Sequence, residues 1–82
     1  MEQINRQKVL TLYVGTGCHL CDLARAILDD VVGVADYEVV NISASDALRA
    51  TYGERIPVVK NTAGREKGWP FTAGQVKKLV SS

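Results

Sequence analysis

The amino-acid sequence predicts a small α/β domain whose elements follow the order strand, helix, strand, helix, strand, strand, helix. Two observations support this fold class. Apolar residues fall either into short unbroken runs bounded by glycine, as in buried strands, or into stripes at three- and four-residue steps, as in amphipathic helices. A strand, a helix and a second strand also follow one another within about 30 residues, which favours a right-handed βαβ unit with parallel strands. The length of 82 residues, 46% of them hydrophobic, suits a single domain over residues 1–82 with one core.

The first three elements form the predicted βαβ unit. Residues 8–14 are nearly all apolar and end at Gly15, so we expect a strand that is buried on both faces. Between residues 18 and 31 the apolar side chains recur at helical spacing, and Gly33 ends this helix. Residues 37–42 then form the second strand.

The second helix is expected to begin at Ser43. This serine and Asp46, three residues later, form a capping-box pattern, in which side chains bond the free N–H groups of the first turn. Leu48 and Tyr52 are four residues apart and would share one face of the helix, and Gly53 would end it.

The C-terminal part is predicted to form a β-hairpin and a last helix. Residues 55–61 form a third strand, with a proline near its start, where no N–H is needed. Residues 61–64 turn the chain, and residues 65–69 return as an antiparallel fourth strand. Thr72 and Gln75 form a second capping box that opens the last helix.

The charge balance and the apolar segments argue against two classes of partner. Ten basic and nine acidic residues leave a formal net charge of +1, which gives no electrostatic footprint for nucleic acid. No segment approaches the roughly 20 apolar residues that span a membrane, and residues 1–6 show no signal-peptide pattern. We therefore expect a cytoplasmic monomer with no nucleic-acid or membrane partner. In the cytoplasm a cysteine pair is seldom a permanent crosslink.

Both cysteines of the chain lie in the stretch GTGCHLCD, residues 15–22, with two residues between them. A structural zinc site takes four Cys or His ligands, but the chain has two cysteines and one histidine, and His19 lies between the cysteines. A disulfide that closes so short a loop would constrain the unfolded chain little. A reactive pair fits better, because Cys18 and Cys21 in the first turn of a helix would have Cβ atoms roughly 5–6 Å apart, near disulfide distance.

The position in the helix distinguishes the two thiols. Cys18 at the helix N-terminus would lie beside unpaired N–H groups that favour the thiolate, which is the attacking species. Cys21, one turn into the helix, would be more shielded and would attack the mixed disulfide formed on Cys18. The pair predicts a thiol–disulfide oxidoreductase in which Cys18 is the nucleophile and Cys21 the resolving thiol, with no bound cofactor.

These motifs resemble those of the glutaredoxin-like group of the thioredoxin-fold superfamily, in particular its small bacterial glutaredoxin-like proteins. The resemblance covers nearly the whole chain and implies a thioredoxin fold, β-α-β-α-β-β-α, with a four-stranded mixed sheet and helices on both faces. It also implies a cis peptide bond before Pro57 and a backbone at Ile56 that bonds an extended substrate. The segments that carry the resemblance are residues 12–13 (LY), 18–22 (CHLCD), 55–58 (RIPV) and 68–71 (GWPF).

Two departures from ordinary glutaredoxins concern glutathione. Ordinary glutaredoxins have a lysine shortly before the cysteines, where this chain has the uncharged residues 14–17 (VGTG). They also have Gly-Gly and an acid near the start of the last helix, where this chain has residues 69–72 (WPFT). The expected partner is therefore a disulfide-containing protein or a small thiol, with glutathione as one open possibility.

Two neighbours of the cysteines could tune their reactivity. A protonated His19 would stabilise the Cys18 thiolate by Coulomb attraction, or it is an exposed loop histidine without such a role. Asp22 could accept the proton of Cys21 during resolution, or it could simply complement the helix dipole. Because their charges are opposite, the two side chains would act on the thiolate in opposite directions.

Other candidate residues come from the loop before the first helix and from the third strand. Thr16 and Gly17 lie where the chain turns tightly and could approach a substrate closely. Arg55 could flank the sulfurs or bind a substrate carboxylate, or it is a surface arginine at a strand end. The sequence leaves two other functions open: a non-catalytic protein-binding module, and metal or iron–sulfur binding across a dimer.

Overall fold

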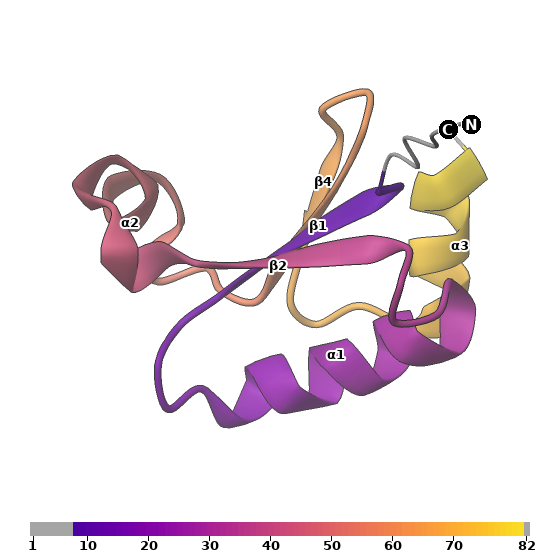
Figure 1. Ribbon diagram of the computed structural model, residues 1–82, viewed down its shortest axis with the longest axis horizontal. Coiled ribbons are helices and arrows are strands. Elements are labelled where there is room, and N and C mark those ends of the chain that lie inside the picture. The colour runs from indigo at the N-terminus through magenta and orange to yellow at the C-terminus, as the bar shows by residue number, and fades with distance from the viewer. Residues whose placement is uncertain (1–7, 82) are drawn as a thin grey trace, which may run out of the picture.

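The computed structural model describes residues 8–81, and the N-terminal segment in which the sequence shows no signal-peptide pattern lies outside them (Figure 1). The predicted elements appear in the predicted order, with one short 3₁₀ turn, η1, added before the second helix. None of the described helices is long and apolar enough to cross a membrane. The elements are β1 (Leu10–Val14), α1 (His19–Val31), β2 (Tyr37–Asn41), η1 (Ile42–Ala44), α2 (Asp46–Tyr52), β3 (Val58–Asn61), β4 (Glu66–Gly68) and α3 (Ala73–Ser81).

The described strands form one four-stranded mixed sheet in the order β2-β1-β3-β4. β1 and β2 run parallel, as predicted for the βαβ unit, whereas β3 is antiparallel to β1 and β4 is antiparallel to β3. Helices α1 and α3 pack together on one face of the sheet, and α2 lies on the other face (Figure 1). This arrangement is the thioredoxin fold that the resemblance implied.

The sheet divides the hydrophobic core into two clusters. Val59 faces α1 and α3 and the adjacent Val58 faces α2, because neighbouring side chains of a strand point to opposite faces. The α2 side of β1 is covered less completely than predicted, since Thr11 and Tyr13 are only half-buried. The short helix α2 reaches only one end of that face, where Tyr52 stacks on Tyr13 with ring centres 4.3 Å apart.

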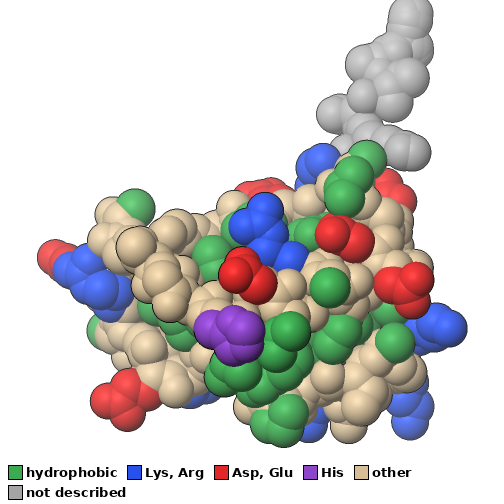
Figure 2. Space-filling view, turned by 90° about the horizontal axis from the view of Figure 1, so that it is seen from below, with side chains coloured by type: hydrophobic (Ala, Val, Ile, Leu, Met, Phe, Trp, Pro, Cys, Tyr) green, Lys and Arg blue, Asp and Glu red, His purple; other side chains and the backbone are tan. Residues whose placement is uncertain are grey.

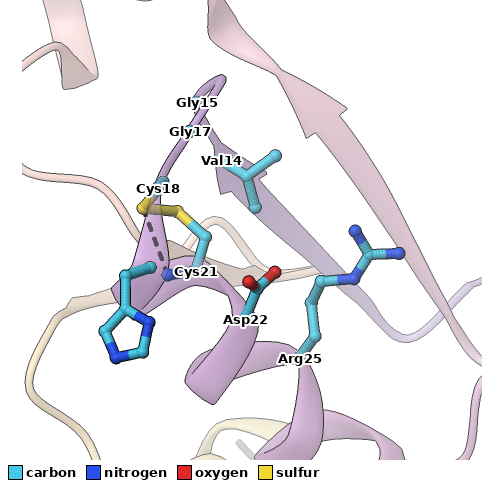
Figure 3. A pocket seen from close by; sticks show the side chains of 8 residues that line it. Val14, Gly15, Gly17, Cys18, Cys21, Asp22 and Arg25 are labelled. Atoms are coloured by element: carbon cyan, nitrogen blue, oxygen red, sulfur yellow. Dashed lines mark hydrogen bonds between the residues drawn. A yellow bond between two sulfur atoms is a disulfide. The ribbon is translucent and has the colours of Figure 1, made fainter.

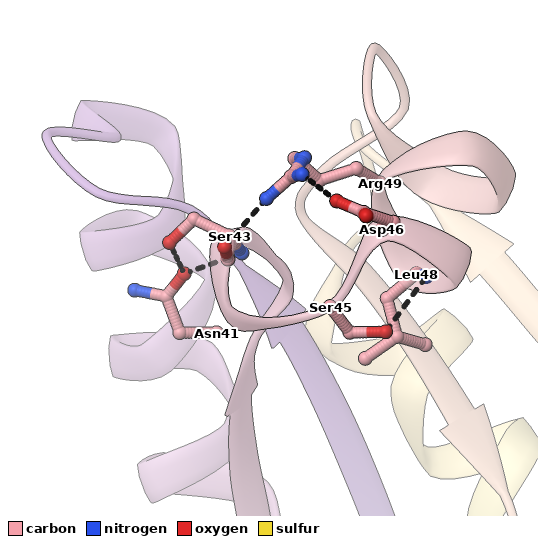
Figure 4. A network of polar contacts seen from close by, with 6 residues as sticks. All are labelled: Asn41, Ser43, Ser45, Asp46, Leu48 and Arg49. Carbon is pink, nitrogen blue, oxygen red and sulfur yellow. Dashed lines mark hydrogen bonds and ion pairs between the residues drawn. The ribbon is translucent and has the colours of Figure 1, made fainter.

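The second helix begins later than predicted. Asn41 Oδ1 accepts hydrogen bonds from the backbone N–H and the hydroxyl of Ser43 at 2.9 and 2.6 Å, which holds Ser43 in η1 (Figure 4). Ser45 is the N-cap instead, and its hydroxyl accepts a hydrogen bond from the Leu48 N–H at 3.3 Å. The capping box predicted for Ser43 and Asp46 is therefore wrong, because the end of β2 already engages the Ser43 side chain.

The start of α3 follows the prediction. The Gln75 N–H donates to the Thr72 hydroxyl at 3.2 Å, and the Thr72 N–H donates to the Gln75 side-chain oxygen at 3.0 Å, which completes the capping box. The peptide bond before Pro57 is cis, as the resemblance implied, and the bond before Pro70 is cis as well. The observed strands are each slightly shorter than the predicted ranges.

Candidate functional site

The two cysteines lie where the chain passes from β1, an inner strand of the sheet, into α1 (Figure 3). Gly17 has a φ of 70°, in the left-handed region that glycine adopts readily, so the loop can turn directly into the helix. A Cβ atom on Gly15 would lie 2.6 Å from Ile56 Cδ1. The absence of a side chain on Gly15 thus lets the loop lie against the segment that precedes β3.

Cys18 and Cys21 form a disulfide, with their Cα atoms 5.2 Å apart. Cys18 is the N-cap of α1, and its Sγ accepts a hydrogen bond from the Cys21 N–H at 3.1 Å. Cys18 is half-buried, whereas Cys21 is only 3% exposed, which confirms the prediction that Cys21 is the more shielded thiol. In the reduced protein, a thiolate on Cys18 would lie where free N–H groups and the helix dipole stabilise negative charge.

A pocket of about 360 Å³ opens beside the disulfide (Figure 3). Both cysteines line it, together with His19, Asp22 and Arg25 from the first two turns of α1. Cys21 is part of the lining although its side chain is only 3% exposed. Within residues 8–81, no group of three or more His, Cys, Asp or Glu side chains is arranged to hold a metal ion.

Arg25 lines the pocket but was not among the residues predicted from the sequence. It follows Asp22 by three residues and Cys21 by four, so the three side chains occupy neighbouring positions on the helix surface. This spacing was the signal that could have identified it, since Arg25 is also the only lysine or arginine in α1. Arg25 adds a positively charged side chain to the lining, and its guanidinium also interacts with the Tyr37 hydroxyl.

The other residues predicted to contact substrate have different surroundings. Gly17 lines the pocket, and the Thr16 hydroxyl accepts a hydrogen bond of 3.4 Å from Asn41 Nδ2 at the end of β2. Ile56 is half-buried and contacts both hydrophobic clusters, and Pro57 is fully buried just before β3. Contact between these residues and a substrate stays a prediction.

Arg55 belongs to a cluster with α2 and β4 and does not line the pocket. Its guanidinium bonds Glu66 Oε1 at 3.2 Å and lies 5.5 Å from the centre of the Tyr52 ring. The Tyr52 hydroxyl donates to Glu66 Oε2 at 2.5 Å. This hydrogen bond is the main cause that raises the pKa of Tyr52, with burial second, and the main cause that lowers the pKa of Glu66. A role for Arg55 in binding substrate stays a prediction.

Glu66→Gln is expected to destabilise the fold more at neutral than at acid pH. Because the pKa of Glu66 is lowered in the folded protein, its carboxylate stabilises the fold above the ordinary value of 4.5, and this contribution is lost as the pH falls through the folded-state pKa. We expect a loss of about 1–2 kcal/mol at pH 7, since the bonds involve a charged but partly exposed group. Urea unfolding at pH 7 and pH 3 measures the difference, with Glu54→Gln at an exposed position as the control. A loss of equal size at both pH values would contradict the electrostatic origin.

Comparisons with known proteins agree with the fold. The glutaredoxin-like domain (DUF836) family matches residues 9–81. The X-ray structure of protein XcR50 from X. campestris is 38% identical over 88% of this chain and 95% of its own, with a TM-score of 0.78. Protein Ne2328 from Nitrosomonas europaea, solved by NMR in solution, is 24% identical over 95% of both chains, and its TM-score of 0.64 shows a shared fold. None of the curated proteins matches the chain.

Proposed function

Because the chain belongs to the glutaredoxin-like domain (DUF836) family, we propose that it is a thiol–disulfide oxidoreductase that uses Cys18 and Cys21 as a dithiol–disulfide pair. The observation that carries the proposal is the unequal exposure of two bonded cysteines at the start of a helix. A sulfur that attacks a substrate has to be reachable, whereas a sulfur that resolves the intermediate only has to reach its neighbour. The half-buried Cys18 suits the first role, and the buried Cys21 suits the second.

The proposed reaction moves two electrons from the protein to the substrate. The Cys18 thiolate attacks one sulfur of the substrate disulfide, forms a mixed disulfide and releases the other substrate sulfur as a thiolate. Cys21 then gives up its proton and attacks the sulfur of Cys18, which releases the second substrate sulfur and leaves the Cys18–Cys21 disulfide. A second thiol compound or protein reduces this disulfide and restores the dithiol, so the cycle needs no bound cofactor.

Neighbouring residues are proposed to assist these steps. Asp22 lines the same pocket as Cys21 and would accept the proton that Cys21 loses. His19, exposed next to Cys18 in the chain, would favour the thiolate when it is protonated. On the side of the loop and β3, the backbone of Ile56 would bond an extended substrate by strand addition.

A redox titration of the cysteine pair tests the proposal. We expect one two-electron transition, with a potential between about −270 and −120 mV, when the protein is equilibrated in glutathione buffers and its free thiols are trapped with a maleimide. The reduced protein should also reduce bis(2-hydroxyethyl) disulfide faster than free glutathione at the same thiol concentration. Protein with both thiols alkylated is the control. A pair that stays oxidised over the whole range, together with no acceleration of exchange, would refute the proposal.

A further inference from the structure

Helix α1 has apolar side chains that are not buried in the core. Its buried face consists of Cys21, Ala24 and Leu28. Leu20 and Leu23 lie outside this face and are 41% and 44% exposed, which places them among the most exposed large apolar side chains of residues 8–81. Both leucines lie within one helical turn of Cys21, at the end of α1 that carries the disulfide.

The fold explains why these two leucines are uncovered. Ile27 continues their stripe four residues after Leu23, and it is half-buried against the main core cluster. Helix α3 packs along the other end of α1, and the disulfide end of α1 extends beyond it (Figure 1). Figure 2 shows hydrophobic side chains gathered beside the histidine on this side of the molecule.

We propose that Leu20 and Leu23 form a docking face for polypeptide substrates whose disulfide is flanked by apolar side chains, an inference that rests on the proposed function. Isolated exposed leucines are common on protein surfaces and need no function. Leu20 and Leu23 differ from such leucines in their position, because Leu20 lies between the two cysteines in the chain and Leu23 follows them within one helical turn. A polypeptide with one sulfur in bonding distance of Cys18 would lie beside this end of α1, with the loop and β3 on its other side. Apolar residues next to its cystine would cover Leu20 and Leu23 and remove their surface from water.

The charges of α1 favour an uncharged polypeptide segment over a small anionic thiol on this face. Arg25 is the only lysine or arginine of α1, and it lines the pocket together with Asp22. Because Arg25 follows Leu23 by two residues, it points to a different side of the helix. The docking face therefore receives no lysine or arginine from α1 that could pair with the carboxylates of a compound such as glutathione. His19, four residues before Leu23, is the titratable base on this side of the helix, and an apolar segment requires no cation.

Two cystine peptides of equal charge test the docking face, one with leucine on both sides of each cysteine and one with serine there. We expect wild-type protein to reduce the leucine peptide with a kcat/KM at least about tenfold above that of the serine peptide. The double substitution Leu20→Gln and Leu23→Gln should bring this ratio close to one, and glutamine preserves helix propensity. Val80→Gln, at a position 40% exposed on α3, is the matched control and should keep the ratio of the wild type.

Each other outcome has a separate meaning. Equal rates of the wild type on both peptides would overturn the docking face, and so would a preference that the double variant keeps. If the same protein reduces bis(2-hydroxyethyl) disulfide, the proposed function is still supported. A wild-type protein that reduces none of the three disulfides would overturn the proposed function and the docking face with it. A dimer in sedimentation that the double variant loses, without any peptide preference, would assign the face to a second copy of the chain and overturn the substrate role.

Discussion

Cys18→Ser is expected to lower disulfide reduction to the uncatalysed rate, whereas Cys21→Ser is expected to accumulate a mixed disulfide on Cys18. A serine hydroxyl does not ionise near neutral pH, so it cannot replace the attacking thiolate. In Cys21→Ser the first attack still occurs, but no second thiol is within reach to release the substrate. The two variants therefore stop the same cycle at different steps.

The geometry of the site gives this assignment its direction. Cys18 is the N-cap residue, and its sulfur receives the Cys21 N–H at 3.1 Å, a hydrogen bond that would strengthen when the sulfur is negative. Cys21 has its own N–H turned toward Cys18 and is 3% exposed. The reverse assignment would require the buried Cys21 to attack the substrate sulfur and the half-buried Cys18 to act as the resolving thiol.

Mass spectrometry of the unreduced protein after incubation with a cystine peptide separates these cases. The peptide adduct should appear on Cys18 of Cys21→Ser and be absent from Cys18→Ser. Ala26→Ser, at an exposed position of α1, controls for the introduction of a hydroxyl into the helix. An adduct on Cys21 in Cys18→Ser would reverse the roles. Partner binding that survives both cysteine substitutions, without any exchange activity, would favour the non-catalytic binding module.

The cysteine site could be predicted from the sequence because its determinants are local. The glycine loop and the helix that starts at the first cysteine follow from residues within one segment of the chain. The shielding of the second cysteine also needs the core cluster that includes Val59 and Val76. The start of α2 shows where local information fails. Ser43 and Ser45 are both acceptable caps, and the Asn41 side chain at the end of β2 decides between them by bonding Ser43. A capping pattern alone does not show which of two serines is the N-cap when a third side chain bonds one of them.

The surroundings of Arg25 and Arg55 could not be predicted fully from the sequence for a different reason. The Arg55 guanidinium is held by Glu66, which lies eleven residues away on β4 and comes close only when the hairpin forms. Arg25 belongs to the site through a pocket whose other wall is the loop before α1. The spacing from Cys21 and Asp22 could have placed Arg25 on their side of α1, but the pocket itself, like the contact of Arg55 with Glu66, forms only through tertiary packing.

Leu28→Ala is expected to destabilise the domain by about 2–5 kcal/mol. The Leu28 side chain is 0% exposed and belongs to the core cluster between α1, α3 and the sheet, so its truncation leaves a cavity that the helix can fill only in part. Domains of this size have a total stability of only about 5–15 kcal/mol. The thermal midpoint should therefore fall by roughly 10–30 °C.

Leu23→Ala is the matched control for this prediction, because it makes the same chemical change on the same helix at a position that is 44% exposed. We expect it to cost less than about 1 kcal/mol, since less apolar surface is withdrawn from the core. Urea unfolding of both variants with the disulfide intact measures the difference, and equal losses would contradict the burial argument. Below its unfolding transition, Leu28→Ala should keep the reduction potential of the wild type, because the hydrogen bond to Cys18 Sγ comes from the first turn of α1. A shifted potential in the folded variant would instead mean that core packing two turns away sets the reactivity of the cysteine pair.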